Sequence, residues 1–249
     1  MQAQDLDSAI DSIRLRFGSQ ALTRAAELPP PQPWPTSTAI DWLTGIGGLP
    51  RGRLSLLTGS GTCGKLTVAL SLLARATQEF AHAMVVDPGG FDPWCLLPFS
   101  PELSALTVVS APAPDIRGES AAALAKAGAG FILLMSGVPE HWLGPIESGA
   151  NRSGSVVVEV VDAPDRALAH ASSFSVDFSR TRWLRERDQV VGLRVSARCT
   201  KNRVAPPLGE SVLDIRYPIW PQQLRDYRPE IVEVPIEAEE VVPRASTAV

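Results

Sequence analysis

The sequence has few of the residues that build disulfide frameworks, metal sites or basic surfaces. Its three cysteines, Cys63, Cys95 and Cys199, are an odd number at wide spacing. That arrangement excludes a disulfide framework and a zinc-site pattern, and it favours a reducing compartment. The three histidines have no acidic partner at the spacing of a catalytic triad or a metal site. The formal net charge is −4, so no overall positive field attracts nucleic acid, although a local arginine cluster remains compatible with DNA binding.

Long apolar runs are also absent. No run approaches the roughly 18 residues needed to span a bilayer. The N-terminus lacks the basic and then apolar pattern of a signal peptide. We therefore expect a soluble cytoplasmic protein without membrane contact. Hydrophobic residues make up 45% of the chain and charged residues 20%, which is ordinary for a globular fold. The length of 249 residues suits one α/β domain with short additions.

The pattern along the chain predicts four segments. Apolar residues at three- and four-residue steps predict an N-terminal helix over 5–28, within a first segment 1–28. Prolines then exclude a helix and predict an extended linker at 29–38. Residues 39–220 form the predicted core. The segment 221–249 is rich in proline and glutamate, which predicts a flexible tail.

Within the core, short apolar segments alternate with helical patterns. Buried strands are predicted at 53–58, 83–87, 106–110, 131–135 and 155–161. Helices are predicted at 65–79 and 120–127. This alternation indicates βαβ units and a mostly parallel central sheet with both faces covered. Later strands separated by turns predict an antiparallel extension at one edge, at 174–178, 190–197 and 211–215.

One motif carries phosphate chemistry. It has the form G-x-x-x-x-G-K, follows a predicted strand directly and precedes a predicted helix, which is the context of a Walker A loop. Its residues are Gly59, Ser60, Gly61, Thr62, Cys63, Gly64 and Lys65. Glycines let backbone N–H groups face an anion, the helix directs its positive end at phosphate, and the lysine reaches the terminal phosphates. ATP is therefore the candidate ligand of this loop.

The positions after the lysine depart from that pattern. Leu66 stands where a Ser or Thr hydroxyl would ligate Mg²⁺, a cation that requires oxygen ligands. Thr67 is rotated by about 100° on the helix, which turns its hydroxyl away from the metal position. Nucleotide binding stays compatible with the loop, whereas Mg²⁺-assisted phosphoryl transfer is compromised. Cys63 is either a redox-sensitive thiol near a helix N-terminus or a small residue that fits the loop.

Beyond this loop, the chain resembles the RecA recombinase family. Residues 40–52 are similar to the family's lead-in, in which an aspartate and a Gly-Gly-Leu-Pro-x-Gly turn precede the Walker strand. Residues 12–23 look like its N-terminal helix, which packs on the neighbouring subunit. Residues 201–207 and 214–217 are similar to segments near the end of its core. The resemblance covers 5–218 and implies a RecA-like P-loop fold, single-stranded DNA binding and a homo-oligomer formed through the N-terminal helix.

The departures from the family concern catalysis. The family's catalytic glutamate follows the strand matching 83–87, where this chain has Pro-Gly-Gly at 88–90. The Walker B strand should end in aspartate, whereas here it ends in Met135-Ser136. Val161-Asp162-Ala163-Pro164 stands in the place of the Asn-Gln pair that senses the γ-phosphate, and the second DNA loop after it is curtailed. With the lost magnesium ligand, these changes describe a degenerate ATPase site.

One segment interleaves arginines with an aromatic residue. Its candidate DNA-binding residues are Arg180, Arg182, Trp183, Arg185 and Arg187. Guanidinium groups beside an aromatic face suit a nucleic-acid backbone and its bases. A solvated hairpin, with Glu186 and Asp188 neutralising part of the charge, fits the same residues equally well.

The leading interpretation is an accessory or scaffold protein of DNA repair or recombination with little or no ATP hydrolysis. It would dock on a recombinase or a translesion polymerase. Short RecA-like accessory proteins of SOS mutagenesis, the ImuA-like group, are similar in having a worn Walker site. Two alternatives stay open. One is an active DNA-dependent ATPase recombinase with displaced ligands such as Thr67, Asp87 or Asp92. The other is a protein-interaction module of a translesion mutagenesis complex that binds no nucleotide.

Overall fold

The computed structural model describes residues 2–18, 32–206, 208–217 and 230–234. The chain divides into two units, Met1–Gln32 and Pro33–Val249. The first unit contains helix α1 (Gln2–Phe17). A continuous helix over 5–28 is therefore wrong. The helix begins earlier and ends before Gly18, whose φ of +92° is typical of a residue that terminates a helix. Residues 19–28 of the predicted helix lie outside the described residues.

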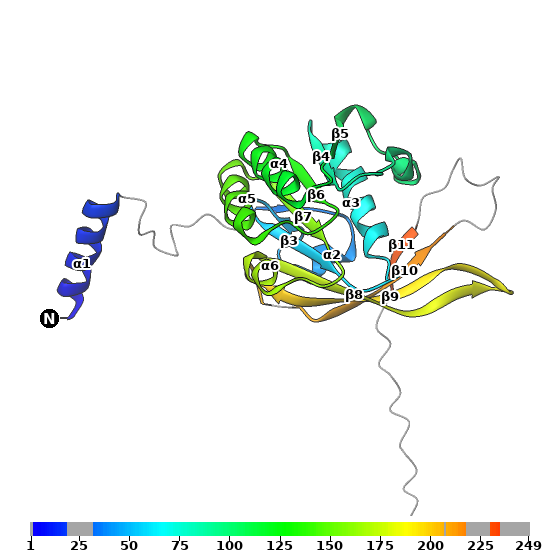
Figure 1. Ribbon diagram of the computed structural model, residues 1–249. Coiled ribbons are helices and arrows are strands. Elements are labelled where there is room, and N and C mark those ends of the chain that lie inside the picture. Colours follow the sequence, from blue (N-terminus) through cyan, green and yellow to red (C-terminus); the bar gives the residue numbers. More distant parts are fainter. Residues whose placement is uncertain (1, 19–31, 207, 218–229, 235–249) are drawn as a thin grey trace, which may run out of the picture. The chain divides into compact units, whose positions relative to one another are not determined.

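The described residues of the second unit form a nine-stranded sheet (Figure 1). Its order is β11-β10-β9-β8-β3-β7-β6-β4-β5. Neighbours from β8 to β5 run parallel, and those from β8 to β11 run antiparallel. The strands are β3 (Leu54–Thr58), β4 (Ala83–Asp87), β5 (Leu106–Ser110), β6 (Phe131–Leu134), β7 (Val156–Val160), β8 (Phe174–Glu186), β9 (Gln189–Asn202), β10 (Glu210–Arg216) and β11 (Glu230–Val234). The predicted α/β class, with a mostly parallel sheet and an antiparallel edge, is confirmed.

Helices cover both faces of this sheet. Helix α3 (Lys65–Glu79) packs on one face and shares a core with Leu57. Helices α4 (Pro114–Ala127) and α5 (Glu140–Ser153) pack on the other face and share a second core with Leu56. Successive strand residues point to opposite faces, so a strand covered on both sides is apolar throughout. This explains why the central strands are recognisable in the sequence. Shorter helices are α2 (Ala39–Leu43), η2 (Pro93–Phe99), η3 (Leu103–Ala105) and α6 (Arg166–Ala171).

The compact body begins earlier than the linker prediction places it. Pro33–Trp34, within the predicted linker 29–38, forms strand β1 and pairs with β2 (Leu49–Pro50). Trp34 is 0% exposed, and its indole Nε1 donates a hydrogen bond to Glu79 at 2.9 Å. Its ring also packs against Phe131. Burial of this large ring with its N–H partnered anchors strand β1 to the body.

Two predictions for the C-terminal part are wrong. The strand at 174–178 is predicted in the antiparallel extension, but it belongs to the parallel part of the sheet on one side. It pairs parallel with β3 there and antiparallel with β9 on its other side. Both β8 and β9 are much longer than predicted and form one extended hairpin. The predicted flexible tail 221–249 contains β11, which pairs with β10. The rest of that tail lies outside the described residues. No described helix is long and apolar enough to cross a membrane.

One carboxyl group lies inside the core beneath α4 and α5. Glu159 on β7 is 0% exposed, and neither of its carboxyl oxygens completes a hydrogen bond. Burial raises the pKa of Glu159 to about 8, and the nearby Asp165 adds to this effect. The Val138 backbone amide and the Arg117 guanidinium act in the opposite direction without cancelling it. The side chain is therefore protonated and neutral at pH 7.

The buried carboxyl group of Glu159 should make the free energy of unfolding fall as the pH rises. The folded state holds the proton up to pH of about 8, whereas the unfolded chain loses it near the ordinary value of 4.5. Its contribution is complete below pH 4.5 and is lost as the pH approaches 8. Glu159→Gln should remove this slope, so that above pH 8 its free energy of unfolding exceeds that of the wild type by up to about 5 kcal/mol. Urea unfolding from pH 5 to 9 measures this, with the exposed Glu119→Gln as control. Parallel pH profiles for wild type and Glu159→Gln would contradict it.

Candidate functional site

The predicted phosphate loop connects β3 to α3, at the carboxyl end of a parallel strand. Gly59, Gly61 and Gly64 have φ values of 137°, 60° and 86°. A Cβ atom on Gly59 would lie 2.2 Å from the carbonyl oxygen of Phe178, and one on Gly64 would lie 2.5 Å from Ile215 Cδ1. Larger residues are therefore excluded at both positions. The loop conformation fits a phosphate group at the N-terminus of α3.

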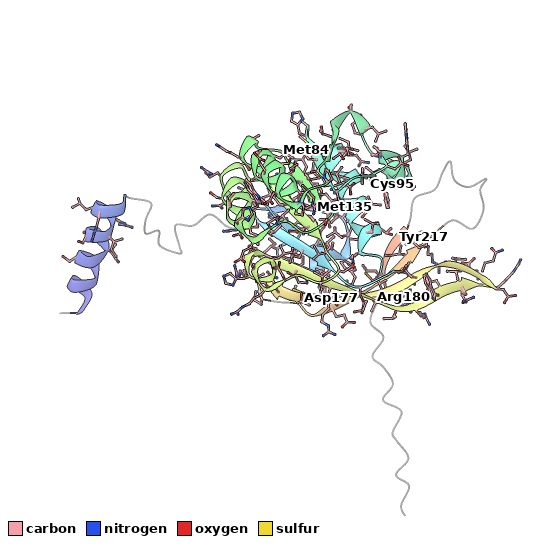
Figure 2. All side chains as sticks on the ribbon, viewed as in Figure 1. Met84, Cys95, Met135, Asp177, Arg180 and Tyr217 are labelled. Carbon is pink, nitrogen blue, oxygen red and sulfur yellow. The ribbon has the colours of Figure 1, made fainter. Side chains whose placement is uncertain are left out.

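A cavity of about 430 Å³ opens beside this loop. It is lined by Gly59, Ser60, Thr62, Asp162, Asp177, Phe178, Ser179 and Arg180. Cys63 is buried behind the loop rather than exposed in the cavity. Figure 2 shows Asp177 and Arg180 at the base of the β8–β9 hairpin. The cavity is thus bounded by the phosphate loop on one side and by the hairpin on the other.

Two protein groups hold the amino group of Lys65. Its Nζ donates to the carbonyl oxygen of Gly59 and forms an ion pair with the carboxylate of Asp162. The Lys65 side chain is 10% exposed, and that of Asp162 is 80% exposed. The carboxylate therefore stands next to the amine on its solvent side, where an incoming terminal phosphate would approach.

A second cavity, of about 390 Å³, lies beside Lys65 and includes Leu66, the position at which the sequence pattern expects a magnesium ligand. It is lined by Lys65, Leu66, Met135, Ser136, Gly137, Val160, Val161 and Asp162. Leu66 is 45% exposed and carries no oxygen, and Met135 offers only a thioether. Mg²⁺ requires oxygen ligands in near-octahedral geometry. The lining supplies only two oxygen-bearing side chains, Ser136 and Asp162, and Asp162 is paired with Lys65, so these residues do not make a complete magnesium site. Among the described residues, no group of three or more His, Cys, Asp or Glu side chains could hold a metal.

The oxygen groups considered as displaced ligands have other partners. Thr67 Oγ1 lies 3.1 Å from the hydroxyl of Tyr217. Asp87 Oδ2 accepts hydrogen bonds at 2.7 and 3.1 Å from two backbone amides of the loop that follows β4. Asp92 accepts one at 3.0 Å from a backbone amide of η2 and caps that helix. These groups stabilise local structure and do not converge on Lys65.

The arginine-rich segment lies on the β8–β9 hairpin, which extends away from the body (Figure 1). Arg180 is at its base, where Nη1 donates to the carbonyl oxygen of Thr62 at 3.3 Å. Its guanidinium carbon lies 4.4 Å from the centre of the Trp183 ring, which is 40% exposed. Arg180 therefore contacts the phosphate loop, unlike the remaining predicted DNA-binding residues.

Those remaining residues lie further along the hairpin. Arg182, Arg185 and Arg187 are exposed and form no ion pair with any residue in the described ranges. Glu186, considered as a neutralising neighbour, pairs instead with Arg216 on β10, with Nη1 and Oε1 3.0 Å apart. The hairpin arginines thus keep their charge uncompensated by Glu186.

Two acidic groups of the site were not identified as functional from the sequence pattern. Asp177 lines the phosphate-side cavity and accepts a hydrogen bond from Thr58 Oγ1 at 2.9 Å. Asp162 is predicted only as a replacement for the family's sensor pair, not as the partner of Lys65. The strand order could have indicated this pairing, because Asp162 follows β7 and β7 is the parallel neighbour of β3. Carboxyl ends of neighbouring parallel strands meet at one edge, which brings these residues together.

Comparison with known proteins is consistent with this arrangement. Residues 4–128 match the family model described as the RecA N-terminal domain, which is half of the chain. Protein RecA of Chlorobium limicola is 26% identical over 258 residues, covering 86% of this chain and 74% of that protein. Protein RecA of Symbiobacterium thermophilum is 28% identical over 256 residues, covering 85% and 73%. Protein RecA of Streptomyces avermitilis is 29% identical over 255 residues, covering 85% of this chain and 68% of that protein. The sequence resemblance is confirmed, and the chain belongs to the RecA family as a divergent member.

Proposed function

We propose that this protein is an accessory factor of DNA repair or recombination that binds nucleotide phosphate without hydrolysing it. The observation that carries this proposal is the lining of the cavity beyond Lys65. Leu66 and Met135 stand there without an oxygen ligand. The oxygen-bearing side chains of the lining are only Ser136 and Asp162, and Asp162 is paired with Lys65. The glycine cradle on the other side of Lys65 still fits phosphate. Binding and hydrolysis are therefore separated in this site.

Hydrolysis of a nucleoside triphosphate depends on metal ions that neutralise developing charge and on a group that orients the attacking water. Beside Lys65 the described residues supply only the Ser136 hydroxyl and the Asp162 carboxylate, and Asp162 is neutralised by Lys65. Asp87, the acid that ends β4, is turned into its own loop by two backbone amides. The cradle residues can still bind and orient the phosphates, through backbone N–H groups and the Lys65 amine. The expected activity is ligand binding.

The β8–β9 hairpin is the proposed DNA-binding element. Arg182 lies directly opposite Arg194 across the two strands, and like charges in that position destabilise a hairpin. The Arg194 guanidinium is held by Asp214 at 2.6 and 2.8 Å. Arg182 acts on Asp214 only through its charge and forms no ion pair within the described ranges, so it is the proposed contact for an external anion. The half-exposed ring of Trp183 offers a stacking surface for a base. A single-stranded nucleic acid supplies both the anion and the base.

Arg180 links the two proposed functions. Its guanidinium contacts the Thr62 carbonyl of the phosphate loop and the Trp183 ring of the hairpin at the same time. A nucleotide that alters the loop around Thr62 would therefore alter the support of Trp183. This contact supports an accessory role in which nucleotide and DNA binding influence each other, alongside docking on a recombinase or a translesion polymerase.

Lys65→Ala should abolish nucleotide binding and leave the fold intact. In the wild type, nucleotide at a hundredfold excess over Kd should raise stability by about 2.7 kcal/mol, because only the folded state binds it. Thermal melting with and without ADP or ATP measures this shift. Lys126→Ala, an exposed lysine on α4, is the matched control and should behave as wild type.

Hydrolysis is tested on the same proteins. Phosphate release with Mg²⁺ and single-stranded DNA should stay at the level of Lys65→Ala. A DNA-stimulated rate that Lys65→Ala abolishes would instead establish an active ATPase with displaced ligands. Equal melting of wild type and Lys65→Ala at millimolar nucleotide would favour a module that binds no nucleotide.

The triple change of Arg182, Arg185 and Arg187 to Gln should weaken binding to single-stranded DNA and reduce its salt dependence. Each phosphate contact adds about 0.7 to the slope of log K against log salt, so three lost contacts should flatten it by about 2. Trp183→Ala should cost about 1–3 kcal/mol of binding through lost stacking. Fluorescence anisotropy of a labelled oligothymidine over a salt series measures both. Arg152→Gln on α5 is the control, and an unchanged slope in the triple variant would contradict the hairpin assignment.

A further inference from the structure

The position of Asp162 is fixed relative to the phosphate loop. Its backbone carbonyl accepts a hydrogen bond from the amide of Gly59 at 3.1 Å. The preceding residue, Val161, donates to the carbonyl of Leu57 on β3 at 3.2 Å. Three residues further on, Asp165 caps helix α6 by accepting from a backbone amide at 2.7 Å. The main chain therefore holds the Asp162 carboxylate at the loop, and only side-chain rotation can move it away from Lys65.

Asp162 carries the same charge as the ligand that the loop is built to bind. Its carboxylate neutralises Lys65, the only lysine of the loop, and so competes with phosphate for that amine. Beyond Lys65 the side chains of Leu66, Met135 and Val160 offer no donor to an anion, and the Ser136 hydroxyl is the one uncharged side-chain donor of the lining. A terminal phosphate placed there would lie beside a carboxylate and hydrocarbon, without Mg²⁺ to screen the repulsion.

The glycine cradle and the region beyond Lys65 therefore differ in how well they accommodate the phosphates of a nucleotide. The glycine cradle, between Gly59 and Gly64, presents backbone N–H groups at the N-terminus of α3 and suits the phosphates nearer the nucleoside. The region beyond Lys65 suits an uncharged occupant. A diphosphate needs only the first region, whereas a triphosphate must also place its terminal group in the second.

Resting on the proposed nucleotide binding, we propose that Asp162 determines specificity by competing with the terminal phosphate for Lys65. The ligand class selected by this loop is a nucleoside diphosphate, bound in preference to the triphosphate. The side chain of Asp162 is exposed and rotates aside for a diphosphate, but it remains within repulsive range of a third phosphate. The selectivity comes from charge and not from shape.

The experiment compares ADP and ATP binding in the presence of EDTA, by isothermal titration calorimetry on the full chain. Wild type should bind ADP about tenfold more tightly than ATP. Asp162→Asn keeps the size of the side chain and removes its charge, so ATP affinity should rise about tenfold and the preference should disappear. Asp115→Asn, a remote exposed acid on α4, should keep the wild-type preference. Circular dichroism confirms that each variant is folded.

The outcomes separate this inference from nucleotide binding itself. If wild type binds ADP and ATP equally and Lys65→Ala loses both, the loop binds nucleotide and the role of Asp162 is overturned. An unchanged preference in Asp162→Asn also overturns it. If neither wild type nor Asp162→Asn binds either nucleotide at millimolar concentration, both proposals fail together.

Discussion

Lys65 leaves the first turn of α3 and meets the Asp162 carboxylate across the phosphate loop. This contact joins β3, α3 and the end of β7, and it depends on the glycines that let the loop pass close to β8. A side chain at Gly59 would collide with the backbone of Phe178, so only glycine fits where the loop passes β8. The hairpin base and both cavities meet at this loop.

The RecA-like fold is kept, and the site differs through the side chains at a few positions beside Lys65. Leu66 and Met135 line the cavity beside Lys65 without offering an oxygen atom, and Met135 also packs against the core beneath α3. The site has therefore become more apolar on one side of Lys65 while the other side stays suited to anions. Without a metal, the site cannot stabilise the charge that develops during phosphoryl transfer, whereas binding alone does not require this stabilisation.

The sequence predicts what depends on local pattern and misses what depends on distant contacts. The central strands are predictable because burial on both faces makes them apolar, and the phosphate loop because its residues are contiguous. No element is predicted from the sequence over 140–153, where the structure has helix α5 with Gly144, Pro145 and Gly149 inside it. In the structure Gly149 lets α4 approach, because a Cβ atom there would lie 2.9 Å from the Lys126 amide. The pairing of Lys65 with Asp162, 97 residues apart, becomes visible only from strand order.

A site that binds nucleotide without hydrolysing it acts only through equilibria. Hydrolysis would drive a cycle in one direction, whereas binding alone makes the protein respond to ligand concentration. The contact of Arg180 with both Thr62 and Trp183 lies between the cradle and the hairpin. Any free energy that couples the two sites through this contact is reciprocal, so DNA on the hairpin must change nucleotide affinity by the factor by which nucleotide changes DNA affinity. Under this proposal, each ligand changes the affinity of the protein for the other, and neither ligand is chemically altered.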